Sequence, residues 1–138
     1  MDTKFSVAVH VLILISESPK PINSEEMARS VGTNASYIRK ILGLLKKADI
    51  VSSHRGVAGF SLSVPPERLT LLRVYQAVTE ESGCHLLDIH QNANDACVVG
   101  RHIQPVLTGM FAQAERAFTR ALSEQTLAQC VAAIRGRL

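Results

Sequence analysis

The sequence predicts a mainly α-helical fold that carries one small β-hairpin. Helical apolar spacing recurs along most of the 138 residues, and one stretch of alternating apolar residues, IVSSHRGVAGFSLS, interrupts it. Across residues 23–63 the order is helix, tight turn, helix and hairpin, which is the order of a winged helix-turn-helix. A later apolar seam adds a long helix of the kind that pairs two subunits.

The first predicted helix spans Lys4 to Glu17 and is apolar on most sides, so we expect it to be buried on several of them. It ends at SESPKPI, where Pro19 and Pro21 break the pattern. Its apolar run of about nine residues, with His10 inside, is too short to span a bilayer. No small-residue cleavage site follows the run. We therefore expect a cytoplasmic protein without a membrane partner.

The second helix and its turn are predicted from capping residues. Asn23 is a good N-cap and Glu26 stands three residues after it, so a helix should begin at Asn23 or Ser24. Gly32 then supplies a sharp turn, because glycine tolerates a positive φ. These signals predict a short helix followed directly by another.

The third helix is expected from Asn34 to Ala48, with apolar side chains on one face and a basic opposite face. Five Lys or Arg stand against Asp49 between residues 34 and 60, a net charge of +4. A solvated basic face would have the same charge, so charge alone does not decide the function. Since the N-terminal part of such a helix usually meets DNA bases, we expect contacts from Asn34, Ser36, Tyr37, Arg39 and Lys40.

The hairpin is expected to have strands at 50–53 and 60–63 and a turn from His54 to Gly59. We expect His54, Arg55 and Gly56 at its tip to contact DNA, with Arg55 in a minor groove or on a phosphate. A plain surface hairpin with an incidental arginine is the alternative. The preceding helix-turn-helix favours DNA contact.

The later chain predicts a helix from Leu69 to Thr79, a polar link from Ser82 to Asp95, and a last helix from Ser123 to Ile134. Between the link and the last helix, apolar residues from Ile103 to Ala121 recur at the spacing of a two-helix seam. We therefore expect a winged helix-turn-helix DNA-binding domain (1–80), a linker or sensor loop (81–100), and a dimerisation helix with a C-terminal helix (101–138).

The blocks SYIRKIL, ADIVSSHRG and LTLLRVYQAV together resemble the IscR/NsrR/CymR group of bacterial winged-helix transcription regulators, the Rrf-two family. This resemblance covers nearly the whole chain and implies a homodimer that presents two recognition helices to a palindromic operator. Cluster-binding members carry three closely spaced cysteines before the long helix, whereas this chain has only Cys84 and Cys97 there. The nearby His85, His90 and His102 leave a metal site open by ligand count alone. The chain is closer to members without a cluster, so we expect neither cofactor nor metal.

The resemblance also points to Cys97 as a redox sensor, because some members respond to oxidants through a cysteine. If Asn94 or Asp95 caps the long helix, Cys97 lies in its first turn and its thiolate is stabilised. If Pro105 stands in the first turn instead, Cys97 lies in a loop. A small buried apolar residue is the third reading. Cys84 is the candidate resolving partner.

Catalytic patterns such as Ser/His/Asp, HExxH or a P-loop are absent, so we do not expect an enzyme. We expect a homodimeric DNA-binding transcriptional repressor. Two signals stay open: thiol oxidation, and a small effector bound between the winged domain and the long helix. A winged-helix protein-interaction module is the alternative class, and the basic third helix argues against it.

Overall fold

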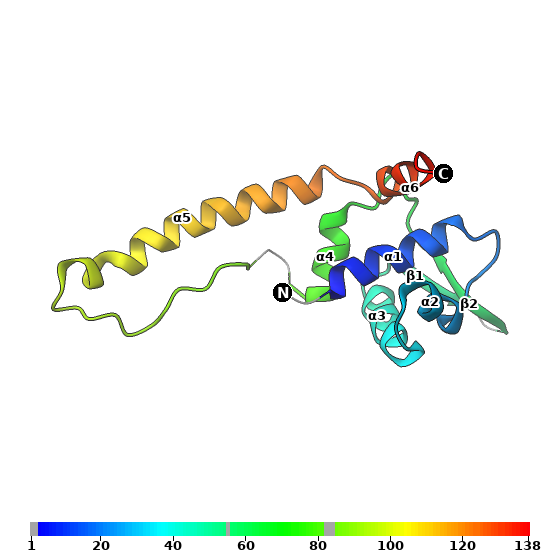
Figure 1. Ribbon diagram of the computed structural model, residues 1–138, viewed down its shortest axis with the longest axis horizontal. Helices are drawn as coiled ribbons and strands as arrows, with labels where there is room; N and C mark the ends of the chain where they lie inside the picture. The colour runs from blue at the N-terminus through cyan, green and yellow to red at the C-terminus, as the bar shows by residue number, and fades with distance from the viewer. Residues whose placement is uncertain (1–2, 55, 82–84) are drawn as a thin grey trace.

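The computed structural model describes residues 3–54, 56–81 and 85–138. Its elements follow in the order α1 (Lys4–Glu17), α2 (Ser24–Val31), α3 (Ala35–Lys47), β1 (Val51–His54), β2 (Val57–Leu62), α4 (Leu71–Thr79), α5 (Val98–Ser123) and α6 (Leu127–Arg135). All of them except α5 gather into one body, and α5 leaves that body as a long arm (Figure 1). The predicted fold class, mainly α with a hairpin wing, is confirmed.

The core of the body is aliphatic and is centred on α1. Ala8, Val11 and Leu12 of this helix have no exposed surface. Side chains from α2, α3, α4 and α6 join the same buried cluster, among them Met27, Ile38, Val74 and Leu127. Burial of one such side chain contributes ~1.5–3 kcal/mol, so this cluster is the main source of stability. The sequence prediction of a first helix buried on several sides is confirmed.

The helix-turn-helix is fixed by two caps and one glycine. The Asn23 side chain accepts a hydrogen bond from the Glu26 N–H at 2.9 Å, and the Asn34 side chain accepts one from the Tyr37 N–H at 2.8 Å. Each bond satisfies a donor at a helix N-terminus that has no partner within its helix. Gly32 ends α2 with φ 86°, in the left-handed region that glycine adopts without strain.

The hairpin has a shorter turn than the sequence predicts. Val51 pairs with Leu62 and the strands run antiparallel, with an irregularity between Ser53 and His54. His54 belongs to β1, and residues 57–59 already belong to β2, so the predicted turn from His54 to Gly59 is wrong at both ends. A bulge of this kind lets a strand continue past a position where the alternation of apolar and polar side chains is interrupted.

The second strand of the hairpin is pinned to the loop between α1 and α2. The Phe60 N–H donates to the Ile22 carbonyl at 3.1 Å. Next to this bond, Gly59 has φ 135°, and a Cβ there would stand 2.7 Å from the carbonyl carbon of Pro21. Only glycine allows the strand to come this close to Pro21, and this close contact holds the wing against the body.

The arm is a single helix whose start lies between the two that the sequence leaves open. It starts at Val98 and runs through Pro105, whose missing N–H removes one helical hydrogen bond without ending the helix. Of the 26 residues of α5, all of which the structure describes, only Leu122 is buried. None of the described helices is both long enough and apolar enough to cross a membrane.

The last helix returns to the body. It begins at Leu127, not at Ser123, because Thr126 and Gln129 form a capping box while the Ser123 hydroxyl donates back to Arg120 and closes α5. The Leu127 N–H donates to the Leu69 carbonyl at 2.8 Å, which docks α6 beside the start of α4. The arm is therefore held at its base by both flanking helices.

Candidate nucleic-acid interface and sensor region

The exposed face of α3 carries the polar residues predicted to meet DNA. Ser36, Arg39 and Lys40 are exposed, and all three lie in the first half of the helix. Tyr37 is half-buried and packs against the core, so its ring helps to hold the helix on the body. The structure thus brings Ser36, Arg39 and Lys40 onto one accessible surface.

Two of the predicted contact residues already have partners within the chain. Asn34 caps α3 through its side-chain oxygen. The Nη1 atom of Arg39 lies 3.4 Å from the Ser24 hydroxyl and 3.5 Å from Glu25 Oε1, which ties α3 to the start of α2. The Arg39 side chain is still 57% exposed, so this weak surface pair leaves most of its donors accessible.

The hairpin lies beside α3 on the same part of the body (Figure 1). The Lys46 ammonium donates to the Ser53 hydroxyl at 2.9 Å and so links the end of α3 to β1. Gly56 is exposed at the tip with φ 78°. Arg55 and the His54 side chain lie outside the described residues, so their predicted DNA contacts stay predictions.

Gly43 is a residue of this face that the sequence reasoning did not single out. It is exposed on α3, and a Cβ added there would meet no atom within 4 Å. Glycine within a helix costs about 0.5–1 kcal/mol relative to alanine, and nothing in the body requires it. Gly43 lies about one turn from Lys40 and Lys47 on the exposed side of the same helix.

Cys97 is exposed and stands at the N-cap position of α5. Its sulfur makes no capping hydrogen bond, yet the backbone N–H groups of Gly100 and Val99 lower the pKa of the thiol, since they favour the thiolate. Neither sequence alternative for the helix start is correct, because α5 begins between the two predicted positions. The reading of Cys97 as a buried apolar residue is wrong.

The other cysteines differ from Cys97. Cys130 in α6 is half-buried beside Leu71, Tyr75 and Leu122, and burial raises the pKa of its thiol. Cys84 lies outside the described residues, so its predicted role as a resolving partner stays a prediction.

The linker comprises residues 85–97, and a carboxylate on the arm holds the start of it. Glu115 accepts hydrogen bonds from the backbone N–H groups of Leu86 and Leu87, and these bonds lower the pKa of its carboxyl. His85 adds an ion pair with Asp88 at 2.7 Å, and this partner raises the pKa of His85. The sequence contains no signal for the Glu115 contacts, because 28 and 29 residues separate the partners.

A winged helix-turn-helix with an exposed basic recognition helix defines a DNA-binding regulator. The Rrf2 family model, described as "Iron-dependent Transcriptional regulator", matches residues 1–133. The chain belongs to this family, which is the Rrf-two family suggested by its sequence motifs. Its relatives are regulators of transcription and not enzymes.

Individual proteins agree with this assignment. The chain is 40% identical over 127 residues to the "Putative HTH-type transcriptional regulator YwnA" of Bacillus subtilis (strain 168), covering 92% of this chain and 93% of that protein. A crystal structure of a "putative DNA binding protein" matches with a TM-score of 0.73 and 38% identity, over 91% of this chain and 96% of that one. CymR (YrzC), the global cysteine regulator of B. subtilis, shares the fold at 16% identity with a TM-score of 0.71, over 96% of this chain and 95% of its own.

The family description names iron, but the described residues do not fit an iron site. No three His, Cys, Asp or Glu side chains come together in the part of the chain that the structure describes. Cys97 lies at the far end of the arm, whereas Cys130 lies in α6 against the body. An iron–sulfur cluster needs several thiolates at one place, and the described residues do not provide them.

Proposed function

We propose that this regulator is a homodimeric repressor that binds a palindromic operator through α3 and the wing. The exposed basic face of α3, with Ser36, Arg39 and Lys40 in the first half of the helix and Lys46 linked to the hairpin, is the observation that carries the proposal. The first half of the helix would lie in the major groove and read base edges, and Gly56 and Arg55 at the wing tip would follow the backbone or the minor groove. A bound dimer would block transcription by occupying the promoter.

The apolar face of the arm supports the dimer. Val99, Val106 and Met110 are 69%, 54% and 63% exposed, and together with Ile103 and Ala117 they lie on one side of α5. Isolated soluble chains rarely leave such a continuous apolar stripe in water. A second copy, related by a twofold axis, would bury the same stripe on both arms.

Lys40 provides the direct test of DNA binding. We expect Lys40→Ala to weaken binding of an operator, obtained by selection from random duplexes, and to reduce the slope of log affinity against log salt by about 1, because one phosphate contact is lost. Arg137→Ala is the matched control, since Arg137 is exposed and follows α6, which lies on the side of the body away from α3 (Figure 1). Equal slopes for both variants would contradict the assignment of α3.

Arg55→Ala tests the wing in the same assay. Loss of this cation should weaken operator binding while leaving the melting temperature unchanged, because the residue stands at the tip of the hairpin sequence. Unchanged affinity would remove Arg55 from the interface.

We also propose that Cys97 is a thiol sensor. It is exposed, its pKa is lowered, and it stands where the arm begins. Attack of its thiolate on a peroxide would form a sulfenic acid and release water after proton transfer, and the added oxygen would change the N-terminus of α5. The Cys84 thiol would then attack the sulfenic acid sulfur, so that a disulfide forms within the dimer and water leaves.

Mild peroxide treatment followed by operator titration tests this control. Wild-type protein should lose affinity and recover it with dithiothreitol, whereas Cys97→Ser should keep its affinity. Cys130→Ser is the control, because that half-buried thiol should not contribute. If Cys97→Ser still responded fully, the sensor would lie elsewhere.

A further inference from the structure

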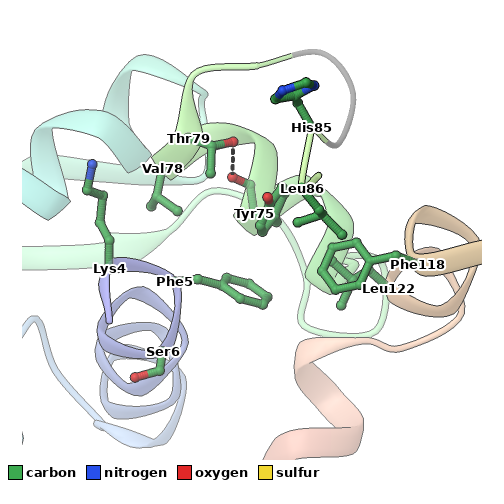
Figure 2. A pocket seen from close by; sticks show the side chains of 10 residues that line it. All are labelled: Lys4, Phe5, Ser6, Tyr75, Val78, Thr79, His85, Leu86, Phe118 and Leu122. Atoms are coloured by element: carbon green, nitrogen blue, oxygen red, sulfur yellow. Dashed lines mark hydrogen bonds between the residues drawn. The ribbon is translucent and has the colours of Figure 1, made fainter. Parts of the chain in front are cut away.

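A pocket lies where the arm leaves the body. Its volume is 430 Å³, within the range of ~300–1,000 Å³ that small-molecule sites occupy. The walls come from α1, α4, the base of α5 and the start of the linker (Figure 2). The pocket thus touches both the DNA-reading body and the arm.

Three aromatic rings from three helices form one side of the pocket. Phe5 and Tyr75 meet edge to face with ring centroids 5.4 Å apart, and Tyr75 and Phe118 meet with centroids 5.6 Å apart. Leu86 closes the space from the linker, and Figure 2 shows the rings of Phe5 and Phe118 directed toward one another. Such rings offer edges and faces to another ring, so the wall favours a flat aromatic guest.

The charges at the pocket argue for a guest without net charge. Among the described residues that line it, the basic side chains are Lys4 and His85, and none is acidic. His85 is already paired with Asp88 at 2.7 Å and lies 3.9 Å from Glu115. An anion would compete with these carboxylates for His85, which leaves Lys4 as the other basic group of the lining, and a cation would lose its water without meeting an acidic partner among the lining residues. An uncharged ring avoids both costs.

Backbone hydrogen bonds help to hold the linker wall. Glu115 accepts the N–H groups of Leu86 and Leu87, which places the Leu86 side chain over the pocket while Leu87 stays 39% exposed. A change of side chain at either position therefore leaves the Glu115 contacts in place. These two neighbours form a matched pair, one inside the pocket and one outside it.

We propose that this pocket binds a small uncharged aromatic molecule, and that occupancy changes the angle between the arm and the body. The guest would touch α1 and α4 on one side and α5 on the other, so it would favour the arm angle that best encloses it. Binding of the molecule does not depend on DNA. Regulation of operator binding through the arm angle rests on the proposed function.

Calorimetric titration of the full chain without DNA tests the binding part, with naphthol, naphthoate and naphthylmethylammonium as probes. Naphthol should bind with a Kd on the order of 10–100 µM, and both charged probes should bind at least about tenfold more weakly. Absence of saturable naphthol binding would overturn the site. If either charged probe bound more tightly than naphthol, the proposal of an uncharged ligand would be overturned.

Two tryptophan variants locate the binding. Leu86→Trp fills the pocket and should abolish naphthol binding, whereas Leu87→Trp adds the same ring outside it and should bind as wild type does. Phe118→Leu is a second test in case Leu86→Trp fails to fold. It removes one ring but keeps an apolar side chain, so it should weaken naphthol binding. Equal binding by all of these variants would place naphthol elsewhere and overturn the site.

Operator titration with and without naphthol tests the regulatory part. Wild type and Leu87→Trp should change affinity when naphthol saturates the pocket, and Leu86→Trp should not. Saturable naphthol binding with unchanged operator affinity would overturn the regulatory role alone. Failure of the protein to bind any operator would contradict the proposed function while leaving the calorimetric result intact.

Discussion

Met110→Ala should weaken the proposed dimer without unfolding the subunit. Met110 lies on the apolar stripe of the arm and is 63% exposed, so it makes little contact with its own chain. Full burial of methionine contributes ~2 kcal/mol, and covering its exposed part therefore contributes about 1.3 kcal/mol. Twofold symmetry places the change in the interface twice, which gives about 2.5 kcal/mol. The dimer Kd should rise roughly sixtyfold, since ~1.4 kcal/mol corresponds to a factor of ten.

Fluorescence-detected sedimentation from nanomolar to micromolar concentrations measures this Kd directly. Thr108→Ala is the control, because Thr108 is exposed on the other side of α5 and its hydroxyl donates back to the Gln104 carbonyl. The melting temperature of the subunit should be unchanged in both variants. A monomeric wild type, or an equal Kd for Met110→Ala and Thr108→Ala, would refute the use of this stripe as the interface.

Three further predictions concern single residues. Asn34→Ala should lower the free energy of unfolding by about 1 kcal/mol because it removes the cap of α3, whereas Asn34→Asp keeps the acceptor; chemical denaturation compares the two. Gly43→Ala should raise the free energy of unfolding by about 0.5–1 kcal/mol and weaken operator binding, because its Cβ meets only solvent in the free protein. A stabilised variant with unchanged affinity would remove Gly43 from the DNA surface. Alkylation by iodoacetamide should be faster at Cys97 than at Cys130, and its midpoint in pH should lie below that of an ordinary thiol, because the lowered pKa of Cys97 leaves more thiolate at neutral pH. Peptide mass spectrometry over a pH series measures both rates, and coincident midpoints would contradict the backbone effect on Cys97.

The elements that the sequence predicts well are those whose ends depend on neighbouring residues. Asn23 and Asn34 cap their helices through the third residue after them, and Gly32 ends α2, so each signal is complete within a few positions. Thr70 caps α4 in the same manner. The bounds of α1 follow from its apolar pattern and the prolines after it.

The elements that the sequence predicts less well depend on distant contacts or on weak caps. Cys97 is not a favoured capping residue, so nothing local marks Val98 as the first residue of the arm. Ser123 and Thr126 are both good caps, so the sequence alone does not decide where α6 begins. In the structure α6 begins after Thr126, where the Leu127 N–H also donates to the distant Leu69 carbonyl. The aromatic pocket combines four separate segments, which no spacing rule within one segment can reveal.

The length of the arm explains why small changes at its base would matter to a dimer. At ~1.5 Å per residue, the 26 residues of α5 span about 39 Å, close to the ~34–36 Å between half-sites one DNA turn apart. A tilt of about 5° at the base moves the far end by about 3 Å, which is close to the ~3.4 Å rise of one base pair. In the proposed dimer, an effect at the Phe118 end of the arm would therefore shift one reading helix by about one base pair relative to the other. A regulator built this way needs no refolding of its DNA-binding body to lose its operator.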